Sequence, residues 1–267
     1  MKKIVFIDVD GTLARDDQTI SDKTIEACKK ARANGHRLFL CTGRSKAELF
    51  PSILEIGFDG LICAGGGYAE LQGVPLFHKC VSIEEVKHVV QYFDTHHIDY
   101  YLESNGGLFG SKHCLSHIMK LTNVQSKEDH PFTNALISDA DVHREDINKV
   151  CFLQPTVPFQ ELVNEFDQAF EVIHCTIPMF GDDSGELAVK GVSKSNAIQE
   201  VLRACHMKKE DSIAIGDGMN DADMLSFCEV GIAMGNAKDG LKAIADMITD
   251  TIDEVGFYKA FVTYHLI

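Results

Sequence analysis

The chain of 267 residues has the composition of an ordinary globular protein, with 45% hydrophobic and 24% charged residues, and its length suits one large domain or two modest ones. Its formal net charge of -15 argues against nucleic acids and anionic membranes as partners, because both bind basic surfaces. The N-terminal segment is too short and too charged for a signal peptide, and no stretch approaches about 18 apolar residues, so we expect a cytoplasmic protein.

The nine cysteines are widely spaced, odd in number and without a C-x-x-C pair. These spacings indicate neither a disulfide framework nor a zinc ribbon. We expect most of them to be small core residues in a reducing compartment. No sequence feature indicates an obligate protein partner.

Strands and helices alternate in the N-terminal part of the chain. Ile4–Ile7 predicts a strand buried on both faces, and Ser21 caps the helix that follows. Arg37–Cys41 and Gly60–Cys63 predict the next two strands, and a turn at Thr42 leads into the helix between them. Alternation of this length predicts parallel strands joined by right-handed crossovers.

The C-terminal part repeats the alternation. Its predicted elements are a helix capped by Ser193, a strand at Ser212–Gly216, a short helix at Asp221–Phe227, strands at Val230–Ala233 and Met247–Thr249, and a closing helix from about Gly256. The two parts together predict the halves of one doubly wound parallel sheet in an α/β fold.

The middle of the chain has α+β character. Its predicted elements are a helix at Ser82–His97, hairpin strands at Tyr100–Glu103 and Leu108–Phe109 around Asn105-Gly106, a strand at Lys149–Leu153, a helix near Phe159–Phe170 and a strand at Val172–Ile177. We therefore predict a core domain from residues 1–82 and 187–267, with residues 83–186 inserted as an α+β cap domain.

Acidic residues follow the predicted strands of the core. Asp8 and Asp10 come after the first strand, and Asp217 and Asp221 lie in the loop after Ser212–Gly216. Because ligands bind at the carboxyl ends of parallel strands, we expect these four carboxylates to share one crevice. Their mutual repulsion requires a cation, and oxygen ligands without histidine or cysteine favour Mg²⁺.

The same edge of the sheet offers groups for a phosphate. Gly11 leaves room for the backbone to approach an anion, and the Thr42 hydroxyl, the backbone near Gly43 and a lysine can donate hydrogen bonds. One carboxylate can attack phosphorus, while another two residues along protonates the leaving alcohol and later activates water. The pattern indicates phosphoryl transfer through a covalent aspartyl-phosphate.

Four motifs occur in a fixed order. They are D-x-D-G-T from Asp8, T-G-R from Thr42, G-V-S-K ending at Lys194 and G-D-x-x-N-D from Gly216. In this order they resemble the haloacid dehalogenase superfamily of phosphatases, most closely its Cof-type branch (subfamily IIB), over essentially the whole chain. The resemblance implies a Rossmann-like core with a C2-type cap, inserted between the second and third motifs, that recognises the leaving group of the substrate.

The resemblance also assigns roles to individual residues. Asp8 is the expected nucleophile, Asp10 the general acid/base, and Lys194 the ammonium that stabilises the phosphoryl group. The expected Mg²⁺ ligands are Asp8, Asp10 through its backbone carbonyl, Asp217 and Asp221. The expected substrate-binding residues are Gly11, Thr42, Gly43, Arg44 and Asn220.

The roles of several residues have two possible interpretations. Lys190 competes with Lys194 for the catalytic role, although the G-V-S-K pattern favours Lys194. Arg44 fits either a substrate-binding residue or a surface arginine. Relatives often carry asparagines after the third strand where this chain has Gly65-Gly66, and this difference predicts a shifted specificity. The acids that fit either a solvated loop or a substrate contact are Asp182, Asp183 and Glu186.

The sequence therefore supports the hypothesis of a Mg²⁺-dependent phosphatase of small phosphorylated metabolites, such as sugar phosphates or phosphorylated cofactors. A phosphosugar mutase of the same superfamily would release isomerised phosphate ester instead of free phosphate. A phospho-aspartate signalling module would accumulate a long-lived phosphoprotein. A binding protein on a retired enzyme scaffold is disfavoured by the intact motifs.

Overall fold

The chain forms two compact units. The computed structural model describes residues 2–138, 140–175, 180–181 and 183–267. Asp182 and the last two residues of the strand expected at 172–177 lie outside the described residues. The core unit comprises Met1–Arg44, Leu49–His78 and Val192–Ile267, and the cap unit comprises Ser45–Glu48 and Lys79–Gly191.

The core unit contains a mainly parallel sheet. Among the described residues its strand order is β14-β13-β12-β1-β2-β3-β4-β5. The strands are β1 (Ile4–Ile7), β2 (Arg37–Cys41), β3 (Gly60–Cys63), β4 (Tyr68–Leu71), β5 (Val74–His78), β12 (Ser212–Gly216), β13 (Val230–Ala233) and β14 (Met247–Ile248). Neighbours from β14 to β3 run parallel, whereas β3, β4 and β5 pair antiparallel. The predicted doubly wound α/β class is confirmed.

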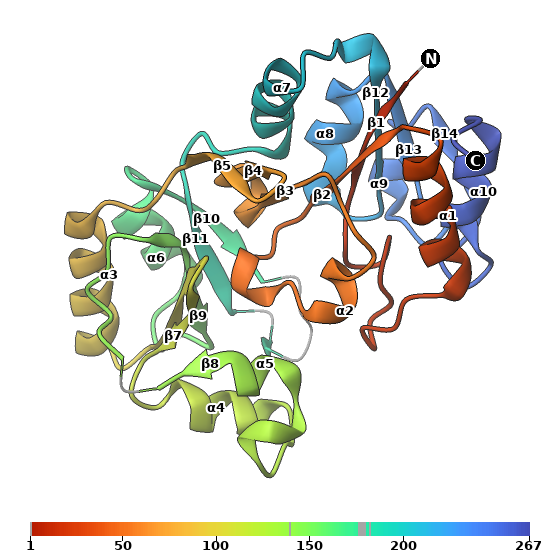
Figure 1. Ribbon diagram of the computed structural model, residues 1–267. Helices are drawn as coiled ribbons and strands as arrows, with labels where there is room; N and C mark the ends of the chain where they lie inside the picture. The colour runs from red at the N-terminus through yellow and green to blue at the C-terminus, as the bar shows by residue number, and fades with distance from the viewer. Residues whose placement is uncertain (1, 139, 176–179, 182) are drawn as a thin grey trace. The chain divides into compact units, whose positions relative to one another are not determined.

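Helices cover both faces of the core sheet (Figure 1). On one face lie α1 (Asp22–Ala33), α2 (Pro51–Leu54) and α10 (Gly256–Thr263), and on the other α7 (Lys194–Ala204), α8 (Ala222–Phe227) and α9 (Asp239–Lys242). Short 3-10 helices are η1 (Lys46–Glu48), η2 (Ala64–Gly66), η3 (Lys127–Asp129), η5 (Lys209–Asp211) and η6 (Met219–Asp221). None of the described helices is long and apolar enough to cross a membrane.

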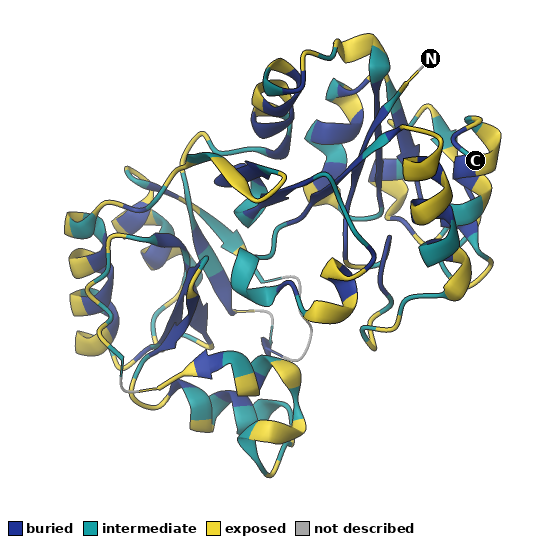
Figure 2. Cartoon of the chain, in the orientation of Figure 1, coloured by how far each residue is buried: buried dark blue, intermediate teal, exposed yellow. Residues whose placement is uncertain are grey.

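Strand β1 shows why the sheet needs both helical layers. Val5 and Ile7 pack with α1 and α10, whereas Ile4 and Phe6 pack with α7 and α8. All four side chains are fully buried, as the dark centre of the sheet in Figure 2 shows. Alternate residues of a strand point to opposite faces, so the apolar run of β1 requires cover on each side.

The antiparallel hairpin of β4 and β5 was not predicted. Its turn consists of Gln72 and Gly73, which both have positive φ, 51° and 78°. Such a turn matches the twist of a hairpin, but its usual sequence signal is Asn-Gly or Asp-Gly. The Gln-Gly pair lacks this signal, and Pro75 within β5 marks an edge strand rather than a central one.

The cap unit contains a mainly antiparallel sheet. Its described strands follow the order β10-β11-β9-β6-β7-β8. They are β6 (Asp99–Ser104), β7 (Gly107–Gly110), β8 (Leu136–Ile137), β9 (Ile147–Leu153), β10 (Phe170–His174) and β11 (Gly185–Val189), with helices α3 (Ile83–Thr95), α4 (Cys114–Leu121), α5 (Pro131–Ala135) and α6 (Phe159–Phe166). The predicted hairpin around Asn105-Gly106 is confirmed as β6 and β7. Helices α4 and α5 and strands β8 and β11 were not predicted.

The two faces of the cap sheet differ in chemistry. One face packs Leu102 and Phe152 against Phe93 of α3 and Phe166 of α6 in an apolar cluster. Residues that alternate with these along β6, β9 and β11 point to the opposite face, and they include several charged side chains. Helices α3 and α6 therefore cover one apolar face, whereas the opposite face packs Tyr101, Cys151 and Leu153 against α4 and α5 beside these charged side chains.

Substituting Phe39 by alanine should destabilise the core unit by about 3–5 kcal/mol, because a large buried side chain leaves a cavity. Phe39 is fully buried on β2 and its ring centroid lies 5.8 Å from that of Phe6. Urea unfolding measures the change. Val74→Ala is the matched control, because the Val74 side chain is 64% exposed, and it should lower the free energy of unfolding by about 0.5 kcal/mol or less. Equal losses of stability in the two variants would contradict the buried packing of Phe39.

Candidate active site

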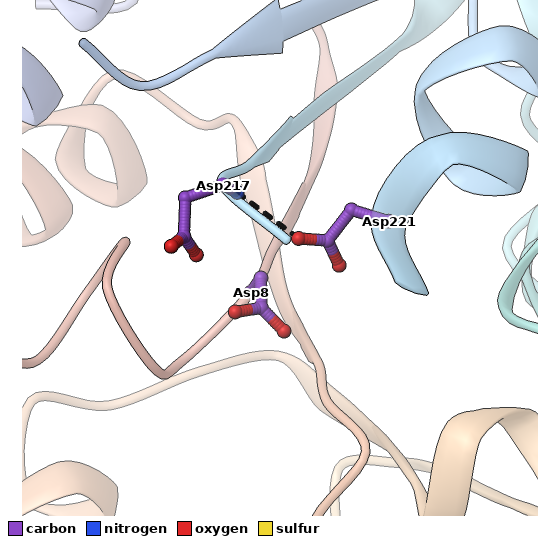
Figure 3. A group of neighbouring side chains, drawn as sticks. All are labelled: Asp8, Asp217 and Asp221. Carbon is purple, nitrogen blue, oxygen red and sulfur yellow. Dashed lines mark hydrogen bonds between the residues drawn. The ribbon is translucent and has the colours of Figure 1, made fainter. Parts of the chain in front are cut away.

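Three carboxylates converge at the carboxyl edge of the core sheet. Asp8 follows β1, Asp217 follows β12, and Asp221 is the N-cap residue of α8. One oxygen atom of each lies within 4.8 Å of the others. Figure 3 shows their side chains directed into a common space. The parallel sheet thus brings together residues that are more than two hundred positions apart in the sequence.

The Lys194 ammonium connects two of these carboxylates. Its Nζ lies 2.7 Å from Asp8 Oδ1 and 2.5 Å from Asp221 Oδ1, and the residue is only 2% exposed. Burial alone would lower the pKa of Lys194, but Asp221 and Asp8 raise it well above its usual value, so the amine is protonated. Lys190, by contrast, is exposed and donates to the backbone carbonyl of Asp167 in the cap unit.

Backbone and hydroxyl donors fix the remaining carboxylate oxygens. Asp221 Oδ2 accepts hydrogen bonds from the backbone N–H groups of Asp217 and Gly218, each at 3.0 Å. Thr12 Oγ1 donates to Asp217 Oδ1 at 3.2 Å. These donors hold the carboxylates of Asp221 and Asp217 in one orientation.

Glycines make room for the acidic side chains. Gly11 has φ of +74°, and a Cβ there would overlap the carboxylate of Asp217. A Cβ at Gly216 would lie 2.5 Å from Asp221 Oδ2, which is closer than any real contact of this kind. Because both positions exclude a side chain, the glycines of two sequence motifs have a direct steric explanation.

The electrostatics of the group favour a bound cation. Burial, followed by repulsion from Asp221, raises the pKa of Asp8 well above its usual value. The same two causes raise the pKa of Asp217 to about 6. The ionised form of these carboxylates is unfavourable unless a positive charge lies beside them. Three carboxylate oxygens are suitable ligands for a hard divalent ion such as Mg²⁺. Asp8, Asp217 and Asp221 could hold such an ion.

Arg44 contacts the second aspartate of the first motif. Its Nε lies 2.9 Å from Asp10 Oδ2, its Nη2 lies 2.5 Å from Asp10 Oδ1, and Nη2 also donates to Gln18 Oε1 at 2.6 Å. This two-point contact is the geometry in which arginine binds carboxylates most specifically. The sequence did not predict the contact between Arg44 and Asp10, because no local pattern links residues 34 positions apart.

Thr42, Gly43 and Asn220 border the same edge of the sheet. Thr42 is 1% exposed, and its hydroxyl accepts a hydrogen bond from the backbone N–H of Arg44 at 3.1 Å. A Cβ at Gly43 would lie 4.0 Å from the amide nitrogen of the exposed Asn220. The two loops therefore lie next to each other, although among the described residues Asn220 makes no direct hydrogen bond to Asp8, Asp10 or Lys194.

Gly66 has a packing role that the sequence did not indicate. Gly66 has φ of +107°, and a Cβ there would overlap the backbone carbonyl oxygen of Ser193, the N-cap residue of α7. Gly65 N–H donates to the Thr42 carbonyl at 3.0 Å. Helix α7 begins with Lys194, so the close approach of η2 to the start of α7 fixes the backbone that carries the lysine.

The Gly66→Ala variant should lower kcat roughly 10- to 100-fold, because a displaced start of α7 moves the Lys194 ammonium away from Asp8. Steady-state hydrolysis of a phosphate ester measures this loss, and circular dichroism checks that the variant folds. Gly65→Asn is the matched control, because Gly65 has φ of +61°, which asparagine tolerates, and open space around its Cβ position. If Gly65→Asn were as inactive as Gly66→Ala, the close approach of Gly66 to the start of α7 would not explain the loss.

The contribution of Asp217 to the stability of the metal-free protein should fall as the pH rises from 3.8 to about 6. Between these pKa values of unfolded and folded Asp217, the folded state binds the proton more tightly, so stability is lost as that proton dissociates. Across this pH range the free energy of unfolding should fall further in the wild type than in Asp217→Asn, by roughly 1 to 3 kcal/mol. Urea unfolding with a chelator tests this, and identical pH profiles would contradict it. Saturating Mg²⁺ should restore stability at neutral pH in the wild type more than in the variant.

Comparison with known proteins places this geometry in a family. The family model of haloacid dehalogenase-like hydrolases matches residues 5–261. Pyridoxal phosphate phosphatase YbhA of Escherichia coli (strain K12) is 25% identical, with 99% of each chain covered. The 5-amino-6-(5-phospho-D-ribitylamino)uracil phosphatase YcsE of Bacillus subtilis (strain 168) is 27% identical, with 97% of this chain and 94% of its own length covered.

A solved structure agrees with these relatives. It is that of a subclass IIB sugar phosphatase, which is 26% identical and superposes with a TM-score of 0.77 over 100% of both chains. The matched region contains all four motifs and the carboxylate group at the end of the core sheet. The chain therefore belongs to the haloacid dehalogenase-like hydrolases and is a hydrolase of the phosphatase type.

Proposed function

We propose that the chain hydrolyses phosphate monoesters of small metabolites through an aspartyl-phosphate on Asp8. The observation that carries this proposal is the contact of the buried Lys194 ammonium with both Asp8 and Asp221. An acid that lies beside a fixed cation can approach a phosphate dianion, because the cation offsets the charge repulsion. The names of the relatives, which include a pyridoxal phosphate phosphatase and a sugar phosphatase, support the same substrate class.

In the first half-reaction, an oxygen of Asp8 attacks phosphorus. The bond from phosphorus to the ester oxygen breaks, and Asp10 in its acid form donates a proton to the departing alkoxide. Lys194, the Thr42 hydroxyl and backbone N–H groups near Gly43 stabilise the charge on the phosphoryl oxygens. The products of this step are the free alcohol and phosphorylated Asp8.

In the second half-reaction, Asp10 acts as a base. Its carboxylate takes a proton from water, the water oxygen attacks phosphorus, and the bond from phosphorus to Asp8 breaks. Inorganic phosphate leaves and both aspartates return to their starting states. Arg44 holds Asp10 at two points, so it orients this carboxylate between the two steps.

We further propose Mg²⁺ as the cofactor, held by Asp8, Asp217, Asp221 and the backbone carbonyl of Asp10. When bound, the ion neutralises charge on the transferred phosphoryl group. The raised pKa values of Asp8 and Asp217 support a cation in their midst. Gly11, Gly43 and Asn220 belong to the proposed phosphate-binding loops.

Residues 83–186 form the specificity domain in this proposal, and the core domain comprises residues 1–82 and 187–267. The cap would recognise the leaving group and exclude water until phosphorylated Asp8 has formed. The nine free cysteines are compatible with a cytoplasmic location.

The Asp8→Asn variant should lose phosphatase activity by about 10³-fold or more, because the amide cannot attack phosphorus as a carboxylate does. Release of p-nitrophenol from p-nitrophenyl phosphate in Mg²⁺ measures the loss. Asp16→Asn, at an exposed acid of the same loop, is the control and should keep full activity. Substantial activity in a folded Asp8→Asn variant, or an inactive wild type with Mg²⁺, would overturn the proposed function.

A further inference from the structure

Glu103 of the cap unit has a buried oxygen without a hydrogen-bond partner. The residue lies on β6 and is 2% exposed. Its Oε1 accepts from the Cys151 thiol at 3.1 Å and lies 3.5 Å from Lys149 Nζ. Its Oε2 is buried and has no hydrogen-bond partner among the described residues. An acceptor left in this state costs about 1–3 kcal/mol, so a further hydrogen-bond donor would stabilise it.

The strand register assembles the polar groups around Glu103. Glu103 is opposite Lys149 in the pairing of β6 with β9, and Glu186 is opposite Cys151 in the pairing of β11 with β9. All four therefore share the face of the cap sheet that α3 and α6 do not cover. We call Glu48, Glu103, Lys149, Cys151 and Glu186 the cap acid cluster.

The cap acid cluster holds more negative than positive charge. Lys149 Nζ lies 2.6 Å from Glu186 Oε2 and 3.5 Å from Glu103 Oε1, so one ammonium is shared between two carboxylates. Glu48 adds a third carboxylate, which accepts hydrogen bonds from the backbone and hydroxyl of Ser45. Burial and then Glu48 raise the pKa of Glu103 well above its usual value. A further hydrogen-bond donor or cation would stabilise the cap acid cluster, whereas an additional anion would destabilise it.

We propose that the cap acid cluster binds a hydrogen-bond donor of the substrate's leaving group, a hydroxyl or an ammonium, through Glu103 Oε2. This inference rests on the proposed phosphatase function. In the sequence, Glu48 of the cap acid cluster lies four positions after Arg44, which contacts Asp10. The substrate class is therefore a monophosphate of a polyol, sugar, amino sugar or amino alcohol, rather than an apolar ester or a bisphosphate.

The Glu103→Gln variant tests this inference on two kinds of ester. Glucosamine 6-phosphate and glucose 6-phosphate carry leaving groups rich in donors, whereas the leaving group of p-nitrophenyl phosphate has none. The wild type should show a higher kcat/KM for at least one sugar phosphate than for p-nitrophenyl phosphate. Glu103→Gln should lower that kcat/KM about tenfold or more and change the p-nitrophenyl phosphate value less than about twofold.

Controls separate this inference from the function on which it rests. Glu145→Gln, at an exposed glutamate of the cap unit, should leave both substrates unaffected. An equal loss on both kinds of ester, no loss on either, or a wild type that prefers p-nitrophenyl phosphate would overturn the role of Glu103 while the phosphatase function stands. A wild type that hydrolyses none of these esters with Mg²⁺ would overturn both.

Discussion

The two buried ion pairs of the Lys194 ammonium are the interactions on which the candidate active site depends. The ammonium lies between Asp8 and Asp221, and all three side chains are almost excluded from water. Two carboxylates held this close in a low dielectric repel strongly, and one cation offsets only part of that repulsion. Asp217 adds a third carboxylate to the group. The negative charge that remains favours a bound cation beside the lysine.

The backbone makes this crowding sterically feasible. Gly11 and Gly216 allow the carboxylates of Asp217 and Asp221 to approach the main chain, and Gly66 allows η2 to approach the start of α7. Each glycine comes from a different part of the sequence, so three separate loops must pack correctly before the charges meet. The precision of the site therefore comes from backbone packing around a parallel sheet, and the charged side chains depend on it.

The sequence predicted the core strands well because their signal is local. β1, β2, β3, β12 and β13 have the predicted bounds, since a short apolar run buried on both faces leaves little choice of register or length. Ser21 and Ser193 cap α1 and α7 as expected, because capping depends on a few neighbouring residues. The hairpin of β4 and β5 was missed because Gln72 adopts a positive φ that its residue type does not indicate.

The residues of the candidate site differ in the same way: some follow from local sequence motifs, and others depend on long-range contacts. Motifs pointed to Asp8, Asp217 and Lys194, but the contact of Arg44 with Asp10 and the cluster around Glu103 depend on tertiary structure and strand register. Glu186 could not be assigned from the sequence, because an acid near a loop is equally consistent with solvent exposure. Its pairing with Lys149 leaves Glu103 short of a partner. The carboxylates at the core sheet edge and the cap acid cluster thus both hold more acids than lysines, which is consistent with the cation and the hydrogen-bond donor proposed for them.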